Sequence, residues 1–151
     1  MIKIQVINGP NLNLLGIREP DIYGTLTLKE INAMLRKKGD ELNMHLDFFQ
    51  SNHEGDIIDK IQDCYGKMDG IVINPGAYTH YSIAIRDAIA AVGIIAVEVH
   101  LSDINSREDF RKISVIKSVC VKQIWGKGAD SYTEALEVIA NKVSEGKSTD
   151  L

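Results

Sequence analysis

The chain has 151 residues, a formal net charge of −4 and 44% hydrophobic residues. This length and composition fit one folded domain over residues 1–151, exclude a disordered chain, and give no electrostatic signature of nucleic-acid binding. No apolar run reaches the roughly 20 residues of a membrane-spanning helix, and the start MIKIQVI lacks signal-peptide features, so we expect a cytoplasmic protein. Cys64 and Cys120 stand apart without CxxC spacing, and we expect no disulfide.

Short apolar segments rich in β-branched residues alternate with helical patterns along the chain. Each such segment is followed by a loop rich in Gly, Pro, Asn or Ser, which is typical of a strand. The predicted strands, in chain order, are Ile2–Asn8, Met44–Ser51, Asp69–Asn74, Ile94–Leu101 and Val115–Trp125.

Helical signals fill the segments between the predicted strands. Apolar residues recur at helical spacing from Ile85 to Val92 and from Tyr132 to Val143, and each stripe gives a helix one apolar face. The polar segment from about Ser144 to Leu151 is expected to be a flexible tail. Capping boxes of the S/T-x-x-E type predict three helix starts, at Thr27 with Glu30, Ser51 with Glu54, and Ser131 with Glu134.

Five strands that alternate with helices predict an α/β fold. The runs Gly70–Ile73 and Ile94–Val97 are continuously apolar, as in parallel sheets that are covered on both faces. We therefore expect a flavodoxin-like three-layer sandwich with a five-stranded parallel sheet. Ligands in such folds bind at the carboxyl ends of the strands, so the loops that follow the strands are the candidate site.

Two of these loops carry residues suited to chemistry. The segment NGPNLNLLGIREPDIYG, residues 8–24, is long, and Arg18 and Tyr23 are placed to form a lid; the alternative is an ordinary connecting loop. After the third predicted strand, Asn74, Gly76 and His80 precede a helix start with free N–H groups, although a histidine there is more often structural.

The strongest local signal lies at the end of the fourth predicted strand. Glu98 and His100 are two residues apart and therefore lie on the same side of the sheet. A carboxylate beside an imidazole fixes its tautomer, which suits a general acid; the alternative is a buried ion pair. Arg107 and Arg111 are four apart and are expected on one helical face, where they reach a carboxylate or face solvent.

The sequence carries no complete cofactor motif. GKGADS at 126–131 lacks the third glycine of a dinucleotide fingerprint, and GKS at 146–148 has Asn141 where a P-loop needs its first glycine. We expect no cofactor. The candidate metal ligands are His53, His80, Glu98 and His100. Only Glu98 and His100 have a local geometric relation, so we also expect no metal site.

A resemblance to a known family covers nearly the whole chain and rests on four motifs. They are P-N-L-N-L-L-G-x-R-E-P-x-x-Y-G at 10–24, N-P-G-A-Y-T-H at 74–80, I-R-D-A at 85–88 and E-V-H-L-S at 98–102. In this order they resemble the type II 3-dehydroquinate dehydratases. The resemblance implies a flavodoxin-like fold, a dodecamer built from trimers, and neither metal nor cofactor. It also implies conversion of 3-dehydroquinate to 3-dehydroshikimate by anti elimination of water through an enolate, the third step of the shikimate pathway.

The same resemblance implies a role for each candidate residue. Tyr23 would take a proton from the carbon beside the substrate ketone, and His100 would protonate the departing hydroxyl. Arg18 would stabilise the Tyr23 phenolate, since a phenol with a pKa of ~10 is protonated at neutral pH. Asn11 would hold a water at the enolate oxygen, and Glu98 would orient His100. Substrate binding is implied for Asn74, Gly76, His80, Arg111, the backbone of Leu101 and Ser102, and Asp87 from a neighbouring subunit.

Some residues fall outside the family pattern or outside the proposed site. Arg107 is expected to support the lid or an ion pair. Asp103, Asn105, Val115 and Lys122 depart from the residues that are common in the family. Asp103 adds negative charge near an anionic substrate, which would weaken binding.

Two non-enzymatic modules and two other dehydratase mechanisms are alternatives to this interpretation. A phosphoacceptor receiver needs acidic residues where Asn8 and Asn74 stand, and a flavin-binding module needs a hydroxyl-rich phosphate loop. A metal-dependent dehydratase is an alternative enzyme, and a Schiff-base dehydratase is disfavoured because the candidate loops contain no lysine. The product serves aromatic biosynthesis or arises in quinate breakdown, and we favour biosynthesis.

Overall fold

The computed structural model describes residues 1–17 and 19–149, so Arg18 and residues 150–151 lie outside the described residues. All five strands are parallel, in the spatial order β2-β1-β3-β4-β5. This arrangement confirms the predicted flavodoxin-like sandwich with a five-stranded parallel sheet. The strands are β1 (Ile2–Asn8), β2 (Met44–Gln50), β3 (Gly70–Asn74), β4 (Ile95–Val99) and β5 (Lys122–Ile124).

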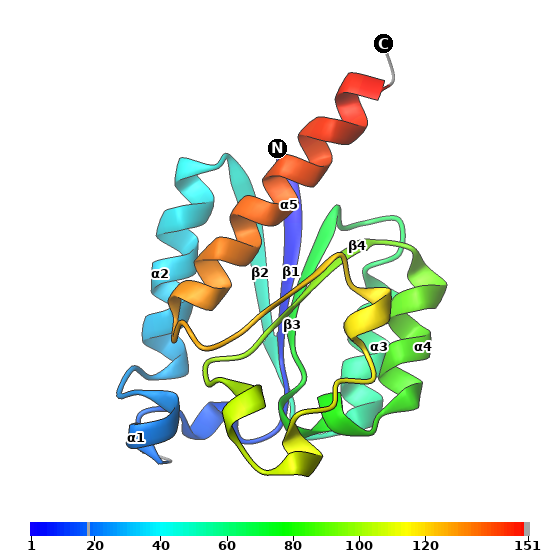
Figure 1. Cartoon of the computed structure of the whole chain (residues 1–151). Coiled ribbons are helices and arrows are strands. Elements are labelled where there is room, and N and C mark those ends of the chain that lie inside the picture. The colour runs from blue at the N-terminus through cyan, green and yellow to red at the C-terminus, as the bar shows by residue number, and fades with distance from the viewer. Residues whose placement is uncertain (18, 150–151) are drawn as a thin grey trace.

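Helices cover both faces of the sheet. Figure 1 shows α2 and α5 on one side and α3 and α4 on the other, with the carboxyl ends of the strands at the lower end of the view. The α-helices are α1 (Pro20–Tyr23), α2 (Leu28–Glu41), α3 (Glu54–Asp63), α4 (Ile83–Val92) and α5 (Asp130–Thr149). Short 3-10 helices lie in the connections: η1 (Leu12–Leu14), η2 (Gly76–His80), η3 (Ile104–Ser106), η4 (Asp109–Arg111) and η5 (Lys117–Val119).

The core has two parts, one on each face of the sheet. Successive side chains of a strand point to opposite faces, so Ile4 and Val6 of β1 pack with α2 and α5, whereas Ile7 packs with α3 and α4. Because both faces are covered, the strands need apolar residues on both sides, which explains their continuous apolar runs. Within the described residues, no helix combines the length and hydrophobicity needed to cross a membrane.

One of the three predicted capping boxes is confirmed, and two are wrong. Thr27 caps α2: its hydroxyl accepts from the Glu30 N–H at 3.2 Å, and the Glu30 carboxylate accepts from the Thr27 N–H at 3.4 Å. The N-cap of α3 is His53 and not Ser51. The Ser51 hydroxyl accepts from the N–H of His53, in the turn before the helix. Ser131 lies inside α5, which begins one residue earlier.

The chain also departs from prediction near its C-terminal end. The predicted strand Val115–Trp125 is strand only over β5, because the Ser114 hydroxyl accepts from the Lys117 N–H and turns the chain into η5. Of the predicted tail, residues 144–149 belong to α5, where Lys142 and Glu145 on successive turns form an ion pair at 3.5 Å, and residues 150–151 lie outside the described residues; its flexibility stays a prediction.

Candidate active site

A cavity of about 160 Å³ lies at the carboxyl ends of β1, β3 and β4. Loops from distant parts of the chain surround it: α1 and the segment with η3 and η4 lie side by side at the lower end of Figure 1. The site residues predicted from sequence that line the cavity are Asn11, Tyr23, Asn74, Gly76, His80, His100, Leu101, Ser102 and Arg111.

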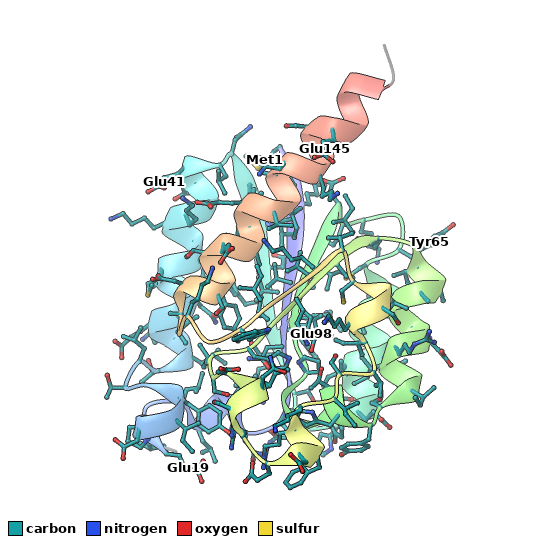
Figure 2. All side chains as sticks on the ribbon, in the orientation of Figure 1. Met1, Glu19, Glu41, Tyr65, Glu98 and Glu145 are labelled. Carbon is teal, nitrogen blue, oxygen red and sulfur yellow. The ribbon has the colours of Figure 1, made fainter. Side chains whose placement is uncertain are left out.

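Behind the cavity wall, Glu98 of β4 is fully buried against His100. Figure 2 shows Glu98 deep inside the molecule, while Glu19 and Tyr65 lie at its surface. The His100 Nε2 atom is 2.5 Å from Glu98 Oε2, which confirms the predicted pairing. Two hydroxyl groups also donate hydrogen bonds to the Glu98 carboxylate, so the Glu98–His100 pair belongs to a larger hydrogen-bond network.

These hydroxyls belong to Thr79 and Ser114. Thr79 Oγ1 donates to Glu98 Oε2 at 2.6 Å, and Ser114 Oγ donates to both carboxylate oxygens at 2.8 and 2.9 Å. Burial by itself raises the pKa of Glu98, but the hydrogen bonds from His100, Thr79 and Ser114 outweigh it and hold this pKa below its usual value. Glu98 is therefore ionised at neutral pH, accepts a hydrogen from His100 Nε2, and leaves Nδ1 as the other functional nitrogen.

Arg107, which was expected only to support the lid or an ion pair, lines the cavity and binds Tyr23 directly. Its Nη1 donates to the Tyr23 hydroxyl at 2.7 Å, and its guanidinium carbon lies 5.2 Å from the centre of the Tyr23 ring. This contact places a positive charge directly against the phenol oxygen. The predicted partner of Tyr23, Arg18, lies outside the described residues.

The expected helical pairing of Arg107 with Arg111 is wrong. Arg107 is the extended residue that ends η3, and Arg111 belongs to η4, so the two are not on one helix. Both nevertheless line the cavity. Arg111 forms an ion pair with Glu108 at 2.9 Å, which fixes the guanidinium at the cavity rim.

Polar groups on the opposite wall come from the end of β3 and from η2. Asn74 Oδ1 accepts from the Gly76 N–H at 3.1 Å. Gly76 has a positive φ of 60°, and a Cβ there would lie 3.1 Å from the carbonyl oxygen of Pro10, so glycine suits both the backbone and the close approach.

His80 presents an acceptor to the cavity. Its Nδ1 lies 2.7 Å from the carbonyl oxygen of Ile113, which can only accept, so Nδ1 carries the hydrogen and Nε2 the lone pair. Burial lowers the pKa of His80, with a smaller opposing effect from the hydrogen bond to Ile113. The ring is therefore neutral near pH 7, and Nε2 can accept a hydrogen bond from a ligand hydroxyl.

Asn11 and Asp87 complete the predicted set. Asn11 has a left-handed backbone with φ of 69°, and Asn52 Oδ1 accepts its N–H at 3.0 Å. Asp87 lies on α4 with its side chain 67% exposed, beside Arg86 at 3.5 Å, and the structure does not bring it to this cavity. In the described part of the chain, no three His, Cys, Asp or Glu side chains converge as a metal site would require.

Fold and site together define an α/β enzyme that carries out acid–base chemistry on a small polar substrate. Residues 2–140 match the family model described as Dehydroquinase class II. The chain belongs to this family, the class II dehydroquinases.

Similar proteins agree in length as well as in sequence. A 3-dehydroquinate dehydratase from Halothermothrix orenii is 56% identical over 146 residues, which are 97% of this chain and 99% of that protein. One from Caldicellulosiruptor saccharolyticus is 60% identical, over 90% of this chain and 94% of that protein. The crystal structure of a type II dehydroquinase from Butyrivibrio crossotus is similar with a TM-score of 0.90 at 54% identity, covering 91% of this chain and 97% of that one.

Proposed function

We propose that this chain is a 3-dehydroquinate dehydratase. It removes water from 3-dehydroquinate by anti elimination through an enolate and releases 3-dehydroshikimate. The reaction is that of a hydro-lyase and forms the third step of the shikimate pathway to chorismate and the aromatic amino acids. Family membership supports the reaction. The observation that carries it is that a phenol paired with a cation and an imidazole paired with a carboxylate line one cavity.

Tyr23 acts as the base. As a phenolate it takes the proton from the carbon beside the substrate ketone, and charge then moves from the phenol oxygen to the enolate oxygen. Arg107 stabilises the phenolate through its hydrogen bond of 2.7 Å. Arg18, five residues before Tyr23, is proposed as a second cation for the same oxygen, and Asn11 holds a water that stabilises the enolate oxygen as its charge forms.

His100 acts as the acid. Its imidazole donates a proton to the hydroxyl that leaves as water, and the ionised Glu98 keeps the ring oriented through its hydrogen bond to Nε2. Tyr23 belongs to α1 and His100 follows β4, so the base and the acid reach one cavity from separate elements, an arrangement compatible with anti elimination.

The substrate carboxylate and ring hydroxyls are bound by the remaining residues. Neither the Leu101 nor the Ser102 N–H has a hydrogen-bond partner among the described residues, so both can donate to a carboxylate. Arg111 adds positive charge to this region. Asn74 and the neutral His80 bind ring hydroxyls, and Gly76 lets the backbone approach closely.

The enzyme is proposed to assemble as a dodecamer of trimers, in which Asp87 reaches the site of a neighbouring copy. This proposal rests on the family resemblance, and the exposure of Asp87 is compatible with it. Large exposed apolar side chains in the same region, Tyr81 and Ile83 near α4 and Phe110 and Ile113 near η4, offer surface to bury. Light scattering tests the assembly, and a fully active monomer would contradict the shared role of Asp87.

We place the enzyme in the cytoplasm, in aromatic biosynthesis. Both assignments rest on the pathway that the family serves. Cell fractionation tests the location. Deletion of the gene tests the role: a requirement for aromatic amino acids supports biosynthesis, whereas growth that fails only on quinate points to breakdown.

The first experiment mixes the purified protein with 3-dehydroquinate in the presence of a chelator and follows the ultraviolet absorbance of the conjugated enone product. Wild type is expected to turn over, and Tyr23→Phe to lose roughly 10²-fold or more in kcat while staying folded by circular dichroism. Activity should also resist borohydride. An inert wild type would overturn the proposed function, and loss of activity with chelator would favour the metal-dependent alternative.

A further inference from the structure

One buried residue of α5 touches the site without lining it. Tyr132 has no exposed surface, although it carries a polar hydroxyl. This hydroxyl donates to Asn8 Oδ1 at 2.6 Å and accepts from Asn74 Nδ2 at 3.0 Å. Asn8 and Asn74 are paired across the ends of β1 and β3, so Tyr132 joins two neighbouring strands where the cavity begins.

The hydrogen bonds around Asn74 determine which way its amide points. Its backbone carbonyl accepts from the Gly9 N–H, and its Oδ1 accepts from the Gly76 N–H. One Nδ2 hydrogen goes to Tyr132. For the second Nδ2 hydrogen, no partner is found in the described part of the chain, and Asn74 lines the cavity. That second hydrogen is the group that Asn74 can offer to a ligand.

Tyr132 prevents the amide from turning over. Its single hydroxyl hydrogen is used by Asn8, so the oxygen can only accept from Asn74. A flipped Asn74 amide would place its oxygen against this lone pair and its NH₂ against the Gly76 N–H, and neither contact is a hydrogen bond. Burial raises the pKa of Tyr132 well above its usual value, so the hydroxyl keeps its hydrogen at any working pH.

We propose that Tyr132 is a positioning residue that holds Asn74 as a hydrogen-bond donor to an oxygen of the substrate. Beside it, His80 Nε2 presents an acceptor, so the two side chains match both functions of a ring hydroxyl. The chemical identity of that hydroxyl rests on the proposed function. The orientation of Asn74 rests on geometry alone.

The test compares Tyr132→Phe with a matched control in the same helix. Phenylalanine keeps the ring and removes only the hydroxyl, while Ile139→Val removes a methyl group from a fully buried residue of α5 that does not line the cavity. Tyr132→Phe is expected to raise KM for 3-dehydroquinate about 10-fold and change kcat less than about threefold. Ile139→Val should lower the melting temperature and leave KM unchanged. Equal KM values for the two variants would overturn the proposal.

A double-mutant cycle separates positioning from general destabilisation. If Tyr132 acts through Asn74, Tyr132→Phe should change KM less than about twofold in an Asn74→Ala background. The same factor in both backgrounds would overturn the proposal. If Tyr132→Phe fails to fold, Asn8→Ala replaces it: Tyr132 could then turn its hydrogen to Asn74, and KM should rise; an unchanged KM contradicts the proposal.

A measurement that does not depend on catalysis tests this inference separately from the proposed function. In NMR spectra of the wild type, the side-chain amide hydrogen of Asn74 that is bonded to Tyr132, assigned by its loss in Asn74→Ala, should exchange slowly with solvent. In Tyr132→Phe it should exchange at least about tenfold faster. Unchanged exchange would overturn the positioning role even if the enzyme proved inert towards 3-dehydroquinate, whereas faster exchange in an inert enzyme would leave only the substrate assignment refuted.

Discussion

The carboxylate of Glu98 depends on hydroxyl donors, and removing one of them should shift the pH dependence of the enzyme. Ser114→Ala deletes the group that donates to both Glu98 oxygens, at 2.8 and 2.9 Å. A hydrogen bond to a charged group contributes about 1.5–3 kcal/mol, and one pKa unit corresponds to about 1.4 kcal/mol. At the low end of this range, the loss of one hydrogen bond raises the Glu98 pKa of the variant by about one unit, and burial, which opposes ionisation, acts in the same direction.

The assay is the pH profile of kcat. At neutral pH, Thr79 and His100 still hold Glu98 ionised, so kcat should change little. On the acid side, His100 loses its charged partner once Glu98 is protonated, so the fall in kcat should begin about one pH unit higher than in wild type.

The effect of Ser114→Ala on the free energy of unfolding should also depend on pH. A depressed carboxyl pKa in the folded state contributes stability above the pKa of the unfolded chain, and this contribution disappears as pH falls through the folded value. The difference in unfolding free energy between wild type and Ser114→Ala should therefore be largest at neutral pH and shrink in acid.

Ser51→Ala is the matched control. The Ser51 hydroxyl also donates to a carboxylate, Asp56, at 2.9 Å, but it does not line the cavity. This variant should lose stability without moving the acid side of the kcat profile. If Ser114→Ala leaves that profile unchanged, or moves it to lower pH, the reasoning about Glu98 is refuted.

Three further substitutions, two of them paired with a control variant, test other parts of the structure. Arg107→Ala should lower kcat roughly 10²-fold because the phenolate loses its cation, while Arg36→Ala, which removes a guanidinium from above a ring remote from the cavity, should leave kcat unchanged. Equal effects would contradict the role of Arg107. Thr27→Ala should cost about 1 kcal/mol in urea unfolding, and no loss would contradict the capping box. Gly70→Ala should cost about 1–3 kcal/mol because its Cβ would lie 2.8 Å from two isoleucine side chains, whereas Gly55→Ala, with open space around it, should stabilise α3; the reverse order would contradict the packing.

Much of this architecture could be predicted because it depends on local patterns. Continuous apolar runs indicate strands that are buried on both faces, as in β3 and β4, and apolar stripes at helical spacing indicate the buried faces of α4 and α5. The pairing of Glu98 with His100 was predictable for the same reason, since residues two apart on a strand share a side. Capping boxes were less informative, because Ser51 and Ser131 use their hydroxyls in the turns around the helix starts.

The residues missed by sequence reasoning act across long separations. Arg107 meets Tyr23 from 84 positions away, and Thr79 reaches Glu98 from a 3-10 helix with no regular spacing to it. Tyr132 was predicted only as part of an apolar stripe, and its burial confirms that prediction. The stripe gives no sign that the Tyr132 hydroxyl binds residues at the ends of the strands. Such contacts follow from the tertiary fold and not from any local pattern.

The docking of α5 on the sheet has a consequence for synthesis of the chain on the ribosome. Until α5 has emerged, β1, β3 and β4 lack the cover of Ala135, Leu136 and Ile139 on one face. The nascent chain then exposes a half-covered parallel sheet, whose pairings are non-local and slow to form. The fold that activity requires should therefore be completed in a single late step, after α5 leaves the exit tunnel, and nascent chains stalled before residue 130 should depend on chaperones.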